Sequence, residues 1–234
     1  MSQNVTKHNI VALLPMKANS ERVKGKNFKD FCGKPLFRWV LDNLLAVPKI
    51  EKIVINTDAR DLLADQGLVD NQKIIIRDRP KSICGDGVSM NLIIEDDLNS
   101  IDSETYLMTH TTNPLLKKES INQALNMFEE EKKNGFDSLF TVTKTQTRFY
   151  DENSRPINHD PDNLIRTQDL TPWFEENSNL YIFSRASFFK KKNRIGVNPK
   201  MFVTEQFEST DIDTPADWDF AEILVSYYRN KGVI

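Results

Sequence analysis

The sequence has little cysteine and no long apolar segment, and both absences exclude classes of protein. Its two cysteines, Cys32 and Cys84, form no C-x-x-C pair, so we expect free thiols rather than a disulfide or a zinc site. No stretch approaches the roughly 18 apolar residues of a membrane-spanning helix. The polar residues 1–9 contain no apolar run fit for a signal peptide, so we expect a cytoplasmic protein without a membrane partner.

Glycine is also scarce, with 8 residues in 234, and the chain contains neither G-x-x-x-x-G-K-[ST] nor G-x-G-x-x-G. This excludes a P-loop nucleotide site and the dinucleotide-binding fingerprint. The net charge of −3 argues against a broad cationic surface for nucleic acid, so any anion site must be local. The composition, 39% hydrophobic and 28% charged, is that of a globular protein whose length fits one domain over residues 1–234.

Apolar runs alternate with amphipathic segments along most of the chain. The first run, residues 10–15, is continuously apolar, as a central parallel strand requires when both of its faces are covered. We expect further strands over 52–57, 73–78, 105–109, 137–143, 180–184 and 201–205, and helices over 35–46, 58–66, 90–98, 120–128 and after a Thr214 cap with Pro215 in the first turn. This alternation predicts an α/β fold with a mostly parallel sheet.

Residues 144–172 depart from this alternation, because they are polar, contain three prolines and show no helical period. Such a composition would suit a disordered linker. Apolar and aromatic residues nevertheless recur in it, namely Phe149, Tyr150, Ile157, Leu164 and Ile165. We therefore expect an extension built from short strands and turns.

The loop directly after the first strand is cationic, with Lys17, Arg22, Lys24 and Lys26 between residues 15 and 27. Ligands of open α/β sheets bind at the carboxyl ends of strands, which is where this loop lies. Its small residues and cations would suit a polyphosphate, while a solvated basic loop is the alternative.

Two further polar segments are candidates for a site. Asp211 and Asp213 are two residues apart, so on an extended segment they point the same way and would suit Mg²⁺. Alternatively, Asp213 is only an acid favoured near the start of the last helix. The segment THTTNP, residues 109–114, follows another strand, and its His110 is more often a structural hydrogen-bonding group than a catalyst when taken alone.

Together these motifs resemble the acylneuraminate cytidylyltransferases, the CMP-sialic acid synthetases and their relatives acting on other 2-keto-3-deoxy sugar acids. The resemblance covers about residues 10–228 and rests on the shared order of PMKANSERVKGKN, GKPLFRWVLDNL, VINTD, Arg79-Pro80, THTTNPLL, ENSNLYIF and STDIDTPADWD. It implies a three-layer α/β domain of the nucleotide-diphospho-sugar transferase type. It also implies that residues 144–172 form a protruding hairpin through which the protein forms a homodimer.

The resemblance further implies a reaction and its residues. CMP is transferred from CTP to the anomeric hydroxyl of a keto-sugar acid, and pyrophosphate leaves. The positions that match nucleotide contacts of the family are Lys17, Ser20, Arg22, Lys26, Asn27 and Arg79, and those on the sugar side are His110, Arg166 and Asn177. Asp211 and Asp213 match the ligands of Mg²⁺, and Lys17, Lys26 and Asp211 are the residues expected to carry catalysis.

The chain departs from the family on the sugar side. It has HTTNP where many members have Gln-Pro-Thr-Ser-Pro, and EENSN where they have Arg-Pro-Asn-Gly-Ala, so that only Asn177 matches. Glu175 and Glu176 would repel a carboxylate but accept hydrogen bonds from hydroxyl or amide groups. We therefore expect a nonulosonate-type acid, with N-acetylneuraminate itself a poor substrate.

Three other functions fit some of these features. A metal-dependent glycosyltransferase also uses a D-x-D motif, but usually in the middle of the chain rather than near its end. A sugar-1-phosphate nucleotidylyltransferase usually has a front loop richer in glycine. A non-catalytic nucleotide sensor would be expected to lose either the cations or the aspartate pair, and this chain has both.

Overall fold

The computed structural model describes residues 8–232, and the polar residues 1–7 lie outside this part. The strands are β1 (His8–Leu13), β2 (Asp30–Phe31), β3 (Lys34–Pro35), β4 (Lys52–Thr57), β5 (Ile74–Asp78), β6 (Ser103–Met108), β7 (Ser138–Thr145), β8 (Trp173–Ser184) and β9 (Pro199–Val203). The α-helices are α1 (Leu36–Leu45), α2 (Arg60–Asp65), α3 (Met90–Ser100), α4 (Lys118–Glu131), α5 (Arg185–Lys191) and α6 (Pro215–Asn230). Within residues 8–232, none of these helices has the length and apolar character needed to cross a membrane.

The central feature is a seven-stranded sheet in the order β5-β4-β1-β6-β8-β7-β9. β8 runs antiparallel to both of its neighbours, while the pairs β4–β5, β1–β4, β1–β6 and β7–β9 are parallel. The predicted mostly parallel sheet is therefore confirmed. The chain leaves β1 toward β4 and β5 on one side and returns to β6 on the other, so the sheet has a topological switch point at the carboxyl ends of β1 and β6.

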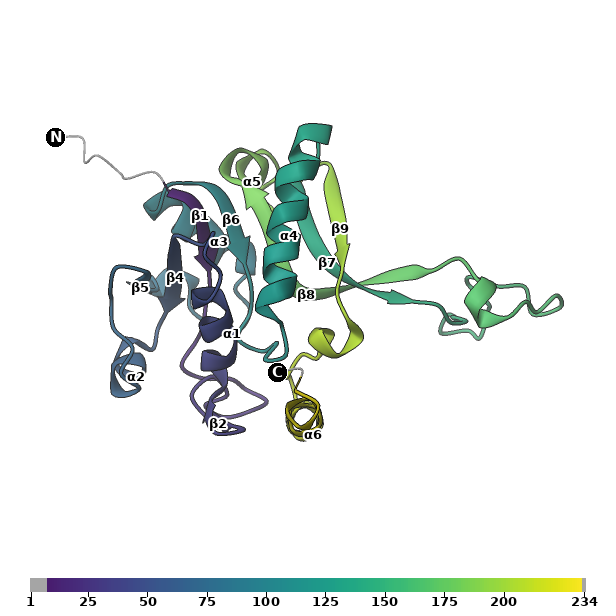
Figure 1. Cartoon of the computed structure of the whole chain (residues 1–234), viewed down its shortest axis with the longest axis horizontal. Helices are drawn as coiled ribbons and strands as arrows, with labels where there is room; N and C mark the ends of the chain where they lie inside the picture. Colours follow the sequence, from purple (N-terminus) through teal and green to yellow (C-terminus); the bar gives the residue numbers. More distant parts are fainter. Residues whose placement is uncertain (1–7, 233–234) are drawn as a thin grey trace.

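Helices cover both faces of the sheet, and alternate residues of β1 face the two layers. Ala12 and Leu14 belong to a core cluster with residues of α1 and α4, the two helices drawn in front of the sheet in Figure 1. Val11 and Leu13 belong to a second cluster with residues of α3 and α5. All four side chains are fully buried, which explains why this strand has no polar alternation. The expected three-layer architecture is confirmed.

The last helix begins as its sequence predicts. Thr214 accepts a hydrogen bond from the backbone N–H of Asp217, and the Asp217 carboxylate accepts one from the backbone N–H of Thr214 at 2.7 Å. This reciprocal pair is a capping box, and Pro215 follows it in the first turn. The buried face of α6 packs on β2, where Trp218 meets Phe31 with ring centroids 5.1 Å apart.

Two short elements were not predicted from the sequence. β2 and β3 form a two-residue hairpin in which Cys32 and Gly33 both have positive φ, 54° and 95°. The usual signal for such a turn is Asn-Gly or Asp-Gly, and Cys-Gly does not indicate it. The other element is α5, which follows directly on β8 with Ser184 as its cap. Both cysteines are free thiols, as expected.

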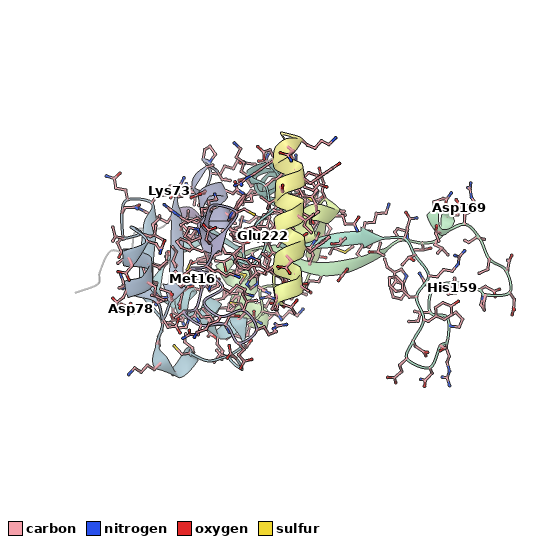
Figure 2. All side chains as sticks on the ribbon, turned by 90° about the horizontal axis from the view of Figure 1, so that it is seen from below. Met16, Lys73, Asp78, His159, Asp169 and Glu222 are labelled. Carbon is pink, nitrogen blue, oxygen red and sulfur yellow. The ribbon has the colours of Figure 1, made fainter. Side chains whose placement is uncertain are left out.

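The expected extension is a hairpin that projects from the body of the molecule (Figures 1 and 2). β7 and β8 pair out to Thr145 and Trp173, and residues 146–172 continue beyond them as turns and one short 3₁₀ helix, Thr167–Asp169. The predicted turns are present, whereas the predicted short strands are reduced to the ends of β7 and β8 and one isolated bridge between Tyr150 and Pro156.

Candidate active site

A pocket of about 190 Å³ opens at the switch point of the sheet. Three loops converge on it: residues 15–27 after β1, residues 79–90 after β5 and residues 110–112 after β6. The predicted site residues that line it are Lys17, Ser20, Lys26, Asn27, Arg79 and His110. The fold therefore gathers most of the predicted nucleotide contacts in one place, although their roles stay predictions.

Short hydrogen bonds fix the cationic loop in place. The backbone N–H of Ala18 donates to Asp58 Oδ1 at 2.7 Å. The Asn27 side chain donates to the carbonyl of Lys17 at 2.8 Å and accepts from the Thr111 hydroxyl at 2.7 Å. Asn27 thus joins the loop after β1 to the loop after β6, and it positions Lys17 through the backbone carbonyl of that residue.

The cations of the loop differ in their surroundings. Lys17 pairs with Asp86 across the pocket and lowers the pKa of that carboxyl group. Lys26 is 8% exposed, and its ammonium donates to the carbonyl of Ile212 at 2.6 Å. Lys24 is exposed and does not line the pocket. The loop therefore presents individual, held cations rather than a uniform basic surface.

Arg79 lies in the pocket wall with most of its guanidinium bonded to protein. It donates to Asn56 Oδ1 at 2.9 Å and to the carbonyls of Asn56 and Met16 at 2.7 and 3.0 Å. Burial lowers the pKa of Arg79. The Asn56 amide is in turn held by Asp97 at 2.8 Å, and burial raises the pKa of Asp97 to about 6. These contacts tie the ends of β1 and β4 together beneath the pocket.

His110 is neutral at pH 7. Its pKa is lowered to about 4, mainly by burial and also by the positive charges of Arg194 and Lys26, against a smaller opposing effect of Asp213. A neutral imidazole can donate one hydrogen bond and accept another. His110 is thus suited to bind hydroxyl or amide groups of a ligand rather than an anion.

The two predicted metal ligands flank the pocket. Asp213 contacts Lys26 and Arg22 at 3.3 and 3.1 Å, so it pairs with two cations of the loop, one buried and one exposed. Asp211 bonds to Thr112 of the pocket, and desolvation by the surrounding protein raises its pKa although one side of the residue is exposed. The charge of Asp213 contributes to the same rise, which indicates that the two carboxylates lie within electrostatic range of each other.

These aspartates fit the donor set of Mg²⁺. Within residues 8–232, no cluster of three or more His, Cys, Asp or Glu side chains is arranged to hold a metal. Mg²⁺, however, is usually bound by one or two carboxylates together with water and substrate phosphates, so two carboxylates beside a cation-lined pocket fit its needs. The raised pKa of Asp211 indicates a carboxyl group that would gain from a nearby cation.

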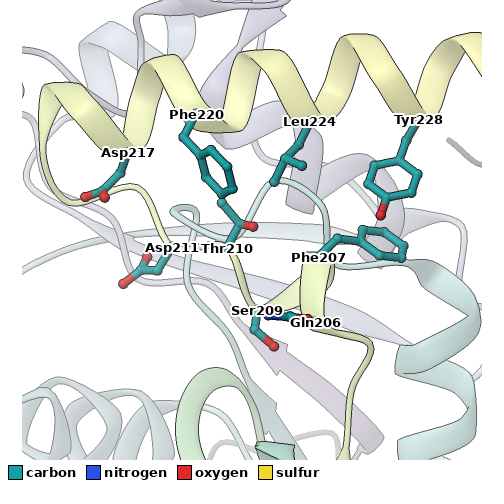
Figure 3. Close-up of a pocket in the computed structure, with 9 residues that line it drawn as sticks. All are labelled: Gln206, Phe207, Ser209, Thr210, Asp211, Asp217, Phe220, Leu224 and Tyr228. Carbon is teal, nitrogen blue, oxygen red and sulfur yellow. The ribbon is translucent and has the colours of Figure 1, made fainter. Parts of the chain in front are cut away.

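A larger pocket of about 460 Å³ lies on the other side of Asp211, between α6 and the short 3₁₀ helix Gln206–Ser209 (Figure 3). Asp211 and Asp217 are at one end of it, and Phe207 and Tyr228 are at the other. Its described lining contains no lysine or arginine. A polyphosphate would meet carboxylates and aromatic rings there, so the smaller, cation-lined pocket is the better candidate.

Asn177 and Arg166 do not line the pocket. The Asn177 side chain lies between the hydroxyls of Thr143, Thr204 and Ser209 at 2.7 to 3.1 Å, whichever way its amide is turned. These contacts join β8 to β7 and to the segment after β9. In this structure Asn177 therefore supports the sheet edge rather than facing a ligand.

Arg166 is exposed in the extension, where it forms an ion pair with Asp169 at 2.7 Å. Figure 2 shows Asp169 on the outer part of the extension and Met16, a pocket residue, in the body of the molecule. The fold thus separates Arg166 from the pocket of its own chain. A contact between Arg166 and the sugar, as the family resemblance implied, would have to come from a second copy.

Two features of the site were missed in the sequence. The first is the loop before α3, whose residues Gly85, Asp86 and Val88 line the pocket together with Met90 at the start of the helix. A Gly-Asp-Gly segment before the Ser89 cap could have indicated it, because a helix start with nearby glycines is a common anion-binding arrangement. The second is Arg194, which belongs to a basic run that resembles a solvated surface in the sequence.

A mostly parallel sheet with a cation-lined pocket at its switch point is the arrangement of an α/β enzyme that binds a phosphorylated ligand. The sequence profile described as "Cytidylyltransferase" matches residues 11–229. The chain therefore belongs to the cytidylyltransferase family and is a nucleotidyltransferase.

Named relatives agree with this family. The chain is 25% identical to a pseudaminic acid cytidylyltransferase of Campylobacter jejuni, with 92% of this chain and 95% of that protein covered. It is 26% identical to an N-acylneuraminate cytidylyltransferase of Oncorhynchus mykiss, with 97% of this chain and 52% of that longer protein covered. In fold it is similar to a CMP:2-keto-3-deoxy-manno-octonic acid synthetase complexed with CTP, at a TM-score of 0.67, 13% identity and coverage of 94% and 99%.

Proposed function

We propose that the protein transfers CMP from CTP to the anomeric hydroxyl of a sialic-acid-like 2-keto-3-deoxy sugar acid and releases pyrophosphate. The names of the two relatives support a cytidylyltransferase that activates an acidic sugar. The observation that carries the proposal is the convergence of Lys17, Ser20 and Lys26 with His110 in one pocket at the switch point.

The cations of the pocket suit the chemistry of this transfer. Negative charge accumulates on the β- and γ-phosphates as pyrophosphate leaves, and fixed positive groups stabilise it. Lys17 is held by an ion pair with Asp86, and Lys26 by an ion pair with Asp213. Each lysine could exchange its carboxylate partner for a phosphate when the nucleotide binds. One such preorganised group contributes about 3–4 kcal/mol to lowering the barrier.

Asp211 and Asp213 would hold Mg²⁺ beside the triphosphate. When bound, the metal would neutralise phosphate charge and lower the pKa of the anomeric hydroxyl. For Asp213, binding would weaken its pairs with Arg22 and Lys26 and so make both cations available to the nucleotide. The pair Asp213–Lys26 would therefore couple metal binding to phosphate binding.

On the sugar side we infer a nonulosonate-type acid. Neutral His110 is a hydrogen-bonding group for hydroxyl or acetamido substituents. Glu175 and Glu176 are both exposed, and Glu176 accepts a hydrogen bond from the hydroxyl of Tyr181. A sugar with amide or hydroxyl substituents would form more hydrogen bonds with His110 and Glu176 than a sugar without them. A homodimer, and a location in the cytoplasm, stay parts of this proposal.

The test is pyrophosphate release from each of CTP, UTP, ATP and GTP with a panel of sugars at saturating Mg²⁺. The panel contains pseudaminic acid, N-acetylneuraminic acid and 2-keto-3-deoxy-manno-octonic acid, with a neutral hexose and a hexose 1-phosphate as controls. We expect release with CTP and a nine-carbon acid, and a lower kcat/KM for N-acetylneuraminic acid than for pseudaminic acid. Equal use of both acids would contradict the specificity, and activity on the neutral hexose or the sugar phosphate alone would contradict the substrate class.

A further inference from the structure

Arg194 lies next to the proposed sugar side of the pocket and is held there by two elements. Its guanidinium carbon lies 3.9 Å from the centroid of the Tyr181 ring on β8, and its Nη2 donates to the Tyr181 hydroxyl at 3.1 Å. Its backbone N–H donates to Asn91 Oδ1 at 3.3 Å, in the first turn of α3. The neighbouring residue Met90 lines the pocket, so these contacts hold Arg194 at its margin.

This cation is only weakly paired. The nearest carboxylate, Glu176, is 3.9 Å away and already accepts the hydrogen bond of Tyr181. In the described part of the chain, the Arg194 side chain donates one hydrogen bond, although a guanidinium carries five N–H groups in a planar fork. The side chain is 20% exposed, so the charge is partly withdrawn from water without a close bidentate partner.

Arg194 and Lys26 are both near His110. The charges of both Arg194 and Lys26 act on the His110 ring, which lines the pocket. Lys17 and Lys26 are the cations that face the phosphates in the proposed function. An acidic sugar beside His110 would still bring a carboxylate, and the Arg194 guanidinium has N–H groups that it does not use within the described part of the chain.

We propose that Arg194 binds the carboxylate of the sugar acid in the same chain, through its planar guanidinium, and so determines that the substrate is an acid. This inference rests on the proposed function and goes beyond it, because it names the group that recognises the carboxylate. Arg166, the cation implied by the family resemblance, is paired with Asp169 on the extension and is not needed for this recognition. Tyr181 and Asn91 act as positioning residues for Arg194.

The experiment compares a sugar acid with its primary amide, which keeps the shape but lacks the charge. The sugar is the best acid found with the wild-type enzyme, and kcat/KM is measured for wild type, Arg194→Gln, Arg194→Met and Arg166→Gln. Arg194→Met keeps an apolar side chain over the Tyr181 ring but has no charge. It replaces Arg194→Gln in the comparison if Arg194→Gln does not fold. Lys192→Gln is the control on the same basic run, because Lys192 pairs with Glu95 instead. CTP binding and thermal melting establish that each variant is folded.

We expect wild type to prefer the acid over the amide by about 10- to 100-fold, the usual effect of one charge-assisted bidentate contact. Arg194→Gln and Arg194→Met should lose this preference through a raised KM for the acid, with CTP binding unchanged, while Lys192→Gln and Arg166→Gln keep it. An unchanged preference in both Arg194 variants, or its loss in Arg166→Gln instead, would overturn the inference while leaving the proposed function intact. Failure of wild-type enzyme to use any sugar acid would overturn both.

Discussion

The ammonium of Lys26 lies 3.3 Å from a carboxylate oxygen of Asp213, although 187 positions separate the two residues in the chain. Lys26 is 8% exposed, and Asp213 is partly exposed at the pocket edge. The contact joins the loop after β1 to the segment before α6. A predicted phosphate ligand and a predicted metal ligand are thus direct neighbours, so a change at one should alter the function of the other.

We expect Asp211→Asn and Asp213→Asn to fold normally and to lose activity by roughly 100-fold or more at limiting Mg²⁺. Each change removes a charged ligand without changing side-chain volume, and one electrostatic group contributes on the order of 3 kcal/mol to such a transfer. The measurement is the initial rate of pyrophosphate release as a function of Mg²⁺ concentration. Asp219→Asn, an exposed acid on α6, is the matched control. Wild-type rates in both site variants would mean that Asp211 and Asp213 do not bind the metal and only stabilise the start of α6.

Lys17→Ala and Lys26→Ala should each weaken the use of CTP strongly, whereas Lys24→Ala should change it little. Lys17 and Lys26 line the pocket, and Lys24 is exposed away from it. A shaped phosphate site depends on where a charge lies, whereas a diffuse basic surface depends only on how many charges there are. The kcat/KM for CTP of the three variants, at one ionic strength, distinguishes these cases. Similar losses at all three positions would favour the diffuse surface.

The extension should mediate a homodimer. Ile157, Leu164 and Ile165 are 50%, 61% and 47% exposed on a hairpin that projects from the body, and an isolated hairpin is marginally stable in water. We expect a dimer by light scattering at micromolar protein, and a monomer for the double variant Leu164→Asp, Ile165→Asp. Leu62→Asp, an exposed leucine on α2, is the control and should stay dimeric. An active wild-type monomer would refute this prediction.

His110 should make the protein less stable on mild acidification. Its folded pKa of about 4 is below the unfolded value of about 6.5, so the unfolded chain takes up the proton first. Stability present above about pH 6.5 is therefore lost as the pH falls toward 4, by about 1–2 kcal/mol between pH 7 and 5. Asp97 opposes this loss, because its folded pKa of about 6 is above its unfolded value, and stability from its protonation is gained as the pH falls through 6.

The variant His110→Gln isolates the first of these effects. It lacks the titrating imidazole and keeps Asp97, so we expect its melting temperature to fall less, or to rise, between pH 7 and 5 relative to wild type. Thermal melts of both proteins in the same buffers at the two pH values provide the comparison. If wild type and His110→Gln shift equally between pH 7 and 5, the pKa of His110 is not lowered in the folded protein.

The sequence alone determined the class of fold and the pocket's cationic loop. Residues 10–15 are apolar throughout because the strand is covered on both faces, and the Thr214–Pro215 start of α6 is local chemistry that needs no distant partner. The hairpin turn at Cys32 and Gly33 was not predictable in the same way, because its positive φ values occur without the usual residue pair. A two-residue hairpin turn can be recognised in a sequence only when it has its common residues, Asn-Gly or Asp-Gly.

Only the tertiary structure decided which predicted residues share the site. Lys17, Lys26, Arg79 and His110 belong to loops that become neighbours because strand order reverses at β1, and a sequence pattern does not contain that reversal. For the same reason the sequence did not single out Arg194, which β8 and α3 hold beside the pocket. Charge, burial and pKa depend on which groups meet in space, whereas the strand and helix periods depend on neighbours in the chain.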